Sequence, residues 1–391
     1  MKKSIKIVSL ILALALVFAF AGCKKTGDGD STTAGTTLAE GQSFAPIAKD
    51  KIKVGVVHIT GKDDTSGYTY AHQKGILEMA EALGLKSEQI LVRDNVNDSD
   101  VEATKAALQD LVDAGCDVIF ATSYNYMDAV EEYAEKYPDI IFSHCSGYKS
   151  NGKNFNNYFG RIYESRYLSG IAAGLKAKQL GVPIVGFVGA KGSDNSEVTG
   201  GINAFALGVQ SVYPECKVLV KITGEWYDPP AEATAAKALL DAGAVVLSQH
   251  CDSDTVQTTA AKADKFGVGY NSDMTPSAPN NHLTAPIWNW GVYYTKTVQA
   301  IIDGTWKCEN YYEGYNVNLV GLSPLNDKAV APGTKEAVEA AQAKIASGEL
   351  FVFSGPIFDN TGKQIIGEGE KLTDEQITGG INYYVKGVEL L

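Results

Sequence analysis

Basic residues are few in this sequence, and no basic run follows the first residues and Lys24-Lys25. The chain holds 34 lysines and arginines against 46 aspartates and glutamates, which gives a formal net charge of -12. Binding to a phosphate backbone depends on clustered lysine and arginine side chains. The composition therefore argues against a nucleic acid as the partner.

Catalytic signatures are also missing. The sequence has no GxSxG, HExxH, GxxxxGK or clean GxGxxG motif, and its five histidines are scattered without metal-ligand spacing. Adjacent acids such as Asp63 and Asp64 occur, but neighbouring surface carboxylates are usually only solvated. We therefore expect a protein that is not an enzyme and that needs no cofactor or metal.

Cysteine spacing gives no sign of a disulfide framework. None of the six cysteines is in CxxC spacing, and five remain when Cys23, discussed below, is set aside. Several of these five lie in or beside predicted strands. We interpret them as buried free thiols: Cys116, Cys145, Cys216, Cys251 and Cys308.

An apolar run near the N-terminus is typical of an export signal. Three lysines precede residues 7–21, a run too short to span a membrane comfortably, which ends in Phe20-Ala21-Gly22-Cys23. This ending resembles a bacterial lipoprotein signal, although Phe20 replaces the usual leucine. We expect loss of residues 1–22, lipid on Cys23 and a polar tether to residue 50, on the extracytoplasmic face of a bacterial membrane. The alternative is an uncleaved anchor or an ordinary signal peptide.

Two stretches of the chain, 128 residues apart, share one pattern. Residues 111–124 read LVDAGCDVIFATSY, and residues 239–252 read LLDAGAVVLSQHCD. In each, Asp-Ala-Gly ends a helix, and Gly115 or Gly243 supplies the left-handed cap. The apolar run that follows is typical of a parallel strand covered on both faces. The repeat predicts two related α/β halves with a ligand cleft between them.

Strands and helices alternate through both halves. We expect strands from about Lys53, Gln89, Val118 and Ile140, and again from about Ile184, Cys216, Val245 and Gly267. In the second half, one helix is expected over 255–266. Beyond residue 281 the pattern predicts a helix over 291–303, a strand over 311–320 and a helix over 335–347.

This order indicates a chain that completes two halves and then crosses back between them. We predict the α/β fold of a type I periplasmic binding protein, with two doubly wound parallel-sheet lobes joined by hinge strands. Residues 51–155 and about 285–312 are assigned to lobe 1. Residues 156–284 and about 313–391 are assigned to lobe 2.

Ligands of open parallel sheets bind outside the carboxyl ends of the strands. Here those ends are rich in aromatic, Asp, Asn and Ser residues and poor in Lys and Arg. Rings can stack on a planar ligand and carboxylates can accept its N–H groups, whereas a phosphorylated ligand would need basic residues. The strand ends are residues 58–70, 94–98, 123–126, 145–148, 189–197, 224–230, 249–254 and 271–274.

Six segments resemble the basic membrane lipoprotein family, the purine nucleoside- or nucleobase-binding components of ABC transporters. The resemblance extends from about residue 51 to residue 391. It implies a lipoprotein that closes on a purine and delivers it to an ABC permease. The segments are DDTSGYTYAHQKG (63–75), YFGRIYESRYLSGIAAG (158–174), EVTGGINAFALGVQSVYP (197–214), EWYDPPAEATAAKALLDAG (225–243), GYNSDM (269–274) and HLTAPIWNWGVYY (282–294).

The resemblance also implies a site. Tyr68 would lie on one face of the purine, Trp226 on the other, and Asp273 at the bottom of the cleft. Each has a structural alternative: helix-start packing for Tyr68, an interdomain plug for Trp226, and a turn cap for Asp273. Further polar contacts are expected at strand ends from Asn95, Tyr124 and Asp252, whereas Glu197 is as easily explained as a charge at a helix N-terminus.

One departure from the family bears on the ligand. Nucleoside-binding members commonly carry a lysine for the sugar hydroxyls after GYNSDM, where this chain has HLTAPIWNW with Trp288 and Trp290. We expect these indoles, and Trp288 in particular, to occupy ribose space, which favours a free base over a nucleoside. A sugar or another small polar solute is the alternative ligand, and a ligand-sensing receptor component is the alternative role.

The lipoprotein interpretation predicts that Cys23→Ala abolishes membrane anchoring, because a polar tether has no membrane affinity of its own. Detergent-phase partitioning of the variant and the wild-type precursor measures this. A variant that still sediments with membranes after a high-salt wash contradicts the interpretation.

Overall fold

The computed structural model describes residues 44–391, so Cys23 and the predicted signal segment lie outside the described residues. Residues 44–391 fall within one compact unit. Residues 44–50, which we assigned to the tether, pack on this unit: the Phe44 ring meets Trp306 edge-on at 5.4 Å, and the Ile47 N–H donates to the Ile301 carbonyl. Their apolar side chains explain this contact. No helix within residues 44–391 is long and apolar enough to cross a membrane.

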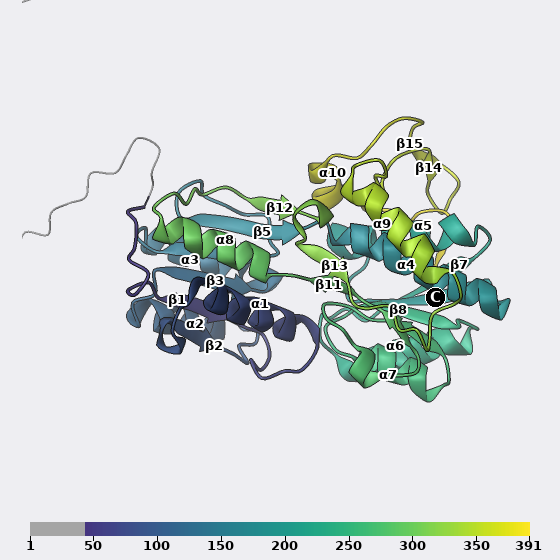
Figure 1. Cartoon of the computed structure of the whole chain (residues 1–391), viewed down its shortest axis with the longest axis horizontal. Coiled ribbons are helices and arrows are strands. Elements are labelled where there is room, and N and C mark those ends of the chain that lie inside the picture. The colour runs from purple at the N-terminus through teal and green to yellow at the C-terminus, as the bar shows by residue number, and fades with distance from the viewer. Residues whose placement is uncertain (1–43) are drawn as a thin grey trace, which may run out of the picture. The chain divides into compact units, whose positions relative to one another are not determined.

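The first lobe is built on a six-stranded parallel sheet in the order β12-β5-β4-β3-β1-β2. Its strands are β1 (Val54–Val57), β2 (Ile90–Arg93), β3 (Val118–Thr122), β4 (Ile141–Cys145), β5 (Phe155–Gly160) and β12 (Tyr311–Glu313). Its helices are α1 (Gly67–Leu83), α2 (Val101–Asp113), α3 (Met127–Lys136) and α8 (Gly291–Ile302), with short 3-10 turns at Ser87–Gln89 and Tyr124–Tyr126. These elements gather on one side of Figure 1.

The second lobe holds the other six-stranded parallel sheet, in the order β10-β9-β8-β6-β7-β16. Its strands are β6 (Ile184–Gly189), β7 (Lys217–Ile222), β8 (Val246–His250), β9 (Phe266–Val268), β10 (His282–Thr284) and β16 (Val388–Leu390). Its main helices are α4 (Ile162–Leu180), α5 (Ser196–Val212), α6 (Pro229–Asp241), α7 (Thr255–Lys262) and α9 (Thr334–Ala346).

The two sheets repeat one strand order, as the 128-residue repeat predicted. The order β4-β3-β1-β2 in the first sheet corresponds to β9-β8-β6-β7 in the second. The repeated stretches become β3 and β8, which occupy equivalent positions. Gly115 and Gly243, with φ of 75° and 97°, supply the left-handed residues after the preceding helices. The predicted fold class is confirmed.

The chain passes between the lobes three times. It leaves the first sheet from β5 into α4, returns through β11 (Pro286–Trp288) into α8, and crosses again from β12 to β13 (Val320–Leu322). Strands β11 and β13 pair antiparallel in the middle of Figure 1. Beyond α9, a hairpin of β14 (Ile357–Phe358) and β15 (Gln364–Ile366), then α10 (Asp374–Gly379), lead to β16.

Two expected elements differ from those observed. The strand expected over 311–320 is divided into β12, a 3-10 turn at Tyr315–Val317 and β13, because Asn318 adopts a left-handed φ of 60°. Helix α7 ends at Lys262 rather than 266, since Asp264 has a φ of 53° and Phe266 already belongs to β9. Both breaks lie at positive-φ residues that helices and strands exclude.

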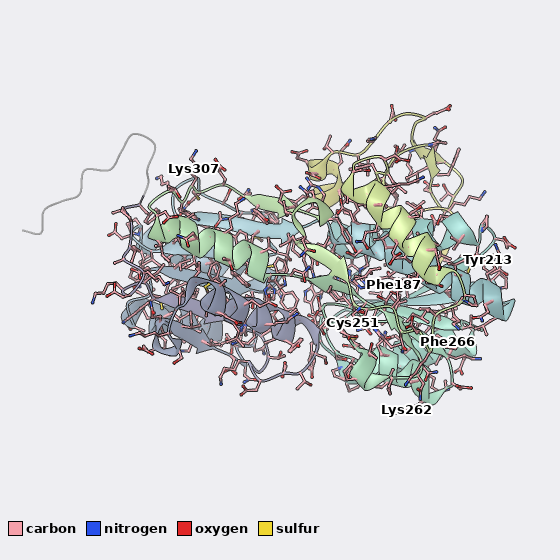
Figure 2. The ribbon with its side chains drawn as sticks, viewed as in Figure 1. Phe187, Tyr213, Cys251, Lys262, Phe266 and Lys307 are labelled. Atoms are coloured by element: carbon pink, nitrogen blue, oxygen red, sulfur yellow. The ribbon has the colours of Figure 1, made fainter. Side chains whose placement is uncertain are left out.

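The core of the second lobe contains large apolar side chains and free cysteine thiols. Phe187 and Cys251 lie inside this lobe (Figure 2), and Phe187 meets Phe205 at 5.5 Å between ring centres. Among the described cysteines, four are buried, Cys308 is half-buried, and all are free. The prediction of free thiols is therefore confirmed for residues 44–391.

Helices α4 and α5 touch backbone to backbone at glycines. A Cβ at Gly170 would collide with the Phe205 carbonyl oxygen, and one at Gly208 with the Tyr167 carbonyl oxygen. Gly200, also in α5, has only an ordinary contact with Ile381, at 3.4 Å from a Cβ. The helix crossing therefore requires glycine at the first two positions and not at the third.

We predict that Gly170→Ala lowers the free energy of unfolding by about 1–3 kcal/mol through overpacking, although alanine alone favours a helix by about 1 kcal/mol. Calorimetric melting of the purified protein measures the change. Gly200→Ala is the matched control and should melt at or above the wild-type temperature. Equal melting temperatures for the two variants would contradict this account of the crossing.

Candidate ligand site between the two lobes

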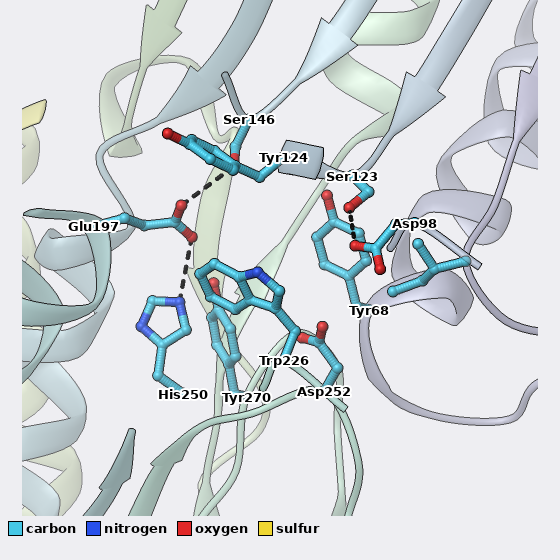
Figure 3. A pocket seen from close by; sticks show the side chains of 11 residues that line it. Tyr68, Asp98, Ser123, Tyr124, Ser146, Glu197, Trp226, His250, Asp252 and Tyr270 are labelled. Atoms are coloured by element: carbon cyan, nitrogen blue, oxygen red, sulfur yellow. Dashed lines mark hydrogen bonds and ion pairs between the residues drawn. The ribbon is translucent and has the colours of Figure 1, made fainter. Parts of the chain in front are cut away.

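The carboxyl ends of the two sheets meet around a small cavity. Side chains from both lobes line it, and Figure 3 shows Tyr68 and Asp98 on one side of Trp226, with Glu197 and His250 on the other. The first lobe contributes Ile59, Tyr68, Asp98, Ser123, Tyr124 and Ser146, and the second contributes Glu197, Trp226, His250, Asp252 and Tyr270.

The lobes touch directly beside this cavity. The Gly67 N–H donates to Ser272 Oγ at 2.9 Å, and Ser146 Oγ donates to Glu197 Oε2 at 3.2 Å. Gly67 has a φ of 85°, and a Cβ there would collide with the carbonyl oxygen of Asp252. A glycine at the start of α1 thus allows the backbones of the two lobes to approach closely.

Two predicted aromatic residues lie on the cavity wall. Tyr68 begins α1, and its hydroxyl donates to Cys145 Sγ at 3.6 Å. Trp226 lies in the loop after β7, where its carbonyl accepts the Asp252 N–H at 2.9 Å and its ring lies 6.0 Å from that of His250. Trp226 remains half-buried, so its ring can contact a molecule in the cavity.

Three carboxylates point toward the same space, and no lysine or arginine is among the lining residues. Asp98 Oδ2 accepts a hydrogen bond from Ser123 Oγ at 2.6 Å, and Asp252 Oδ1 accepts one from Asn271 Nδ2 at 3.0 Å. Burial raises the pKa of Asp252 well above its usual range, despite the Asn271 hydrogen bond. The site therefore presents carboxyl groups and no lysine or arginine to a ligand.

Glu197 is the carboxylate that both lobes hold. It lies in the first turn of α5, where its Oε1 is 3.3 Å from His250 Nε2, while its Oε2 accepts from Ser146. Burial raises the pKa of Glu197 to about 7, and burial lowers that of His250 well below 6.5. A neutral His250 can then donate through Nε2 to the carboxylate. Glu197 also borders a second cavity, which adjoins the first.

Tyr270 forms the inner wall, and Trp288 lies behind it. The Trp288 Nε1–H donates to the Tyr270 hydroxyl at 3.4 Å, and the indole stacks on Trp290 at 4.3 Å. Both indoles are buried, at 3% and 0% exposure, and neither lines this cavity. Where ligand contact was expected of them, Trp288 at the end of β11 packs against Phe159, and Trp290, just before α8, stacks on His72.

Two other predicted site residues lie away from the cavity. Asn95 is exposed in the loop after β2, with a φ of 57°. Asp273 Oδ1 accepts from the Thr275 N–H at 2.9 Å and from its hydroxyl at 2.6 Å, so it caps the following turn. The structure thus brings Tyr68, Tyr124, Trp226 and Asp252 together but leaves Asn95, Asp273 and Trp288 outside.

The remaining lining residues were not selected from the sequence. Six of them lie within the strand-end ranges expected to border a ligand, and Tyr270 precedes such a range by one residue. The strand-end rule was therefore the signal that could have found them. They are Ile59, Asp98, Ser123, Ser146, Glu197, His250 and Tyr270.

Several known proteins are similar in sequence to this chain. Residues 52–352 match the family model described as PnrA-like ABC transporter substrate-binding protein. A purine-binding protein of Brucella abortus (strain 2308) is 38% identical over 88% of this chain and 95% of its own length. The putative ABC transporter glucose-binding protein TsgA13 of Haloferax volcanii is 32% identical over 93% of this chain and 88% of its own length.

A solved structure shows the same fold. The solute-binding protein of an ABC transporter from Aeropyrum pernix K1 aligns with a TM-score of 0.65 at 17% identity, over 86% of this chain and all of that one. The predicted family and the prediction of a binding protein rather than an enzyme are confirmed by the family match. This chain belongs to the PnrA-like family of ABC transporter substrate-binding proteins.

Proposed function

We propose that this ABC transporter solute-binding protein captures a purine base or nucleoside in the cavity between its lobes. The observation that carries the proposal is the pairing of aromatic rings, Tyr68 and Trp226, with three carboxylates in a cavity wall that has no cationic side chain. A purine presents flat π faces to the rings and N–H groups to the carboxylates. The resemblance to a purine-binding protein at 38% identity supports the same ligand class.

A sugar is the second candidate, because one relative is named as a putative glucose-binding protein. A tryptophan face and carboxylate acceptors also suit a ring that carries hydroxyl groups. The two candidates differ in their need for a second aromatic face, which Tyr68 offers to a purine from the opposite lobe. That second ring favours the purine.

Capture would proceed by closure of the lobes on the ligand. Each lobe supplies part of the wall, so only a closed arrangement surrounds the ligand completely. The contacts from Gly67 to Ser272 and from Ser146 to Glu197 join the lobes and exist only when they are together. A ligand that touches both lobes shifts the equilibrium toward this state. The permease partner would then recognise the closed shape.

The lipid anchor on Cys23 completes the proposal. It would keep the protein at the extracytoplasmic face of a bacterial membrane, beside its permease. A ligand-sensing receptor would use the same closure and the same anchor. Uptake of labelled purine by cells with and without the gene separates transport from sensing, since a sensor leaves uptake unchanged.

Calorimetric titration of protein lacking residues 1–23 tests the ligand class directly. We expect adenine, hypoxanthine or their nucleosides to bind at least a hundredfold more tightly than glucose, a difference of about 2.7 kcal/mol. Mass spectrometry of any molecule that co-purifies provides an independent identification. Tight glucose binding with no heat from any purine would reverse the proposal in favour of the sugar.

We predict that Trp226→Ala weakens purine binding by about 2–4 kcal/mol, roughly 30- to 700-fold. The Trp226 indole would stabilise the complex in two ways, by burying apolar area and by stacking on the ligand ring, and neither contact exists in the unbound protein. Tyr227→Ala is the matched control, because Tyr227 is the neighbouring aromatic, is 52% exposed and does not line the cavity. Calorimetry and thermal melting of both variants separate binding from stability. Near-normal affinity with a strongly lowered melting temperature would make Trp226 a structural residue.

A further inference from the structure

An arginine is buried behind the ligand cavity without a carboxylate partner. Arg166 in α4 is completely buried and is not among the lining residues. Its Nη1 donates to the Gln249 carbonyl at 2.5 Å, but within residues 44–391 its Nε and Nη2 have no hydrogen-bond partner and no carboxylate lies within 4.0 Å. A buried charge without compensation is costly, so its surroundings must stabilise it in another way.

Besides the Gln249 carbonyl, the face of an aromatic ring on the cavity wall stabilises the buried charge of Arg166. The Arg166 guanidinium carbon lies 3.8 Å from the centre of the Tyr270 ring, a cation–π contact that is strong when desolvated. The Tyr270 ring also contacts His250, whose ring centre lies 4.5 Å away. Arg166 is therefore separated from the cavity by the side chains of Tyr270 and His250.

Helix α5 brings Glu197 toward the same guanidinium. Gly201 lies one turn after Glu197, and a Cβ at Gly201 would be 3.5 Å from Arg166 Nε and 3.2 Å from His250 Nδ1. Because Gly201 has no side chain, α5 can approach both Arg166 and His250. His250 Nε2 contacts Glu197 Oε1 at 3.3 Å, so these two lining residues lie together in front of the buried Arg166.

The charge of Arg166 favours an ionised Glu197. Burial raises the pKa of Glu197, while the hydrogen bond from Ser146 and then the positive charge of Arg166 lower it; burial and then the charge of Arg166 lower the pKa of His250. Lys191, near the Trp226 ring at 5.9 Å, already pairs with Glu225 at 3.7 Å. Other titratable groups facing Glu197 are Tyr68, Tyr124, Cys145, Asp252 and Tyr270; of these, Asp252 is the other carboxyl group.

We infer that Arg166 is a positioning residue that, without touching the ligand, holds Glu197 ionised as the acceptor for a ligand N–H group. This inference rests on the proposed function. Selectivity for ligands with an N–H donor is then set partly by a side chain outside the cavity. Neutral His250 assists by donating to Glu197 and leaving the remaining lone pairs of the carboxylate for the ligand.

The test is the pH dependence of purine affinity, measured by calorimetry from about pH 5.5 to about pH 8.5. The probe is adenine or hypoxanthine, whichever the wild-type protein binds more tightly. Wild-type affinity should fall as the pH drops through about 7, where Glu197 takes up a proton and loses its acceptor character. Glu197→Gln should bind weakly with a flat profile, which assigns the titration to Glu197 rather than Asp252.

Arg166→Gln should move the midpoint of the profile upward by about one pH unit or more, because the carboxylate loses its positive neighbour. Affinity at about pH 7 should fall about fivefold or more, because the ionised fraction of Glu197 falls by that factor. The matched control is Lys176→Gln, which removes another buried cation of α4, one that lies 4.2 Å from the Phe266 ring and does not line the cavity. Its profile should match that of the wild type.

Several outcomes overturn the inference. A folded Arg166→Gln or Arg166→Met protein with the wild-type midpoint shows that the charge is not needed. If neither variant folds, carbon NMR titration of Glu197 in the unliganded wild type decides: a midpoint near 7 or below supports compensation by Arg166, and one well above 7 contradicts it. A wild-type protein that binds no purine contradicts the proposed function instead, so the two failures are distinguishable.

Discussion

The structure depends on one constraint: all strands of both six-stranded sheets run parallel, so each sheet gathers all its strand carboxyl ends at one edge. Loops and helix starts must follow each strand at that edge, and their backbone N–H and C=O groups cannot take part in the hydrogen bonds between strands. Facing two such edges toward each other creates an enclosed space with loops from both sides. The cavity follows from this arrangement, and its chemistry follows from the residues that end each strand.

Desolvation then determines how those residues behave. Glu197 and Asp252 lie where water is largely removed, which raises the free energy of their charged forms. Asp252 receives a side-chain amide donor, and Glu197 receives a hydroxyl, an imidazole and the field of Arg166. The acids thus differ in environment although they share a cavity. A ligand that supplies donors relieves the same cost that the protein partly offsets.

A second arginine, Arg161, joins the first crossing between the lobes to β12 and to the C-terminal segment. Arg161, between β5 and α4, donates from Nη2 to Asp374 Oδ2 at 2.6 Å and lies 3.5 Å from Glu313 Oε2. Asp374 begins α10, in a segment beyond residue 352 where the family match ends. The C-terminal segment therefore contacts the first crossing as well as extending the second sheet through β16. A fork-shaped guanidinium suits this role because it bonds two carboxylates in fixed geometry.

The sequence by itself determined the duplicated α/β plan, the strand positions, the free thiols and the edge at which a ligand would lie. These features depend on local periodicity, glycine caps and the alternation of elements, which are properties of neighbouring residues. The family resemblance pointed to Tyr68 and Trp226, and the strand ends pointed to Tyr124 and Asp252; all four line the cavity. Only the tertiary structure decided that Asp273 caps its own turn, that Asn95 faces solvent, and that Trp288 packs behind Tyr270. It also decided that Glu197, His250 and Arg166 come close together, because they lie on α5, β8 and α4 of the second lobe and their proximity depends on glycine contacts between these elements.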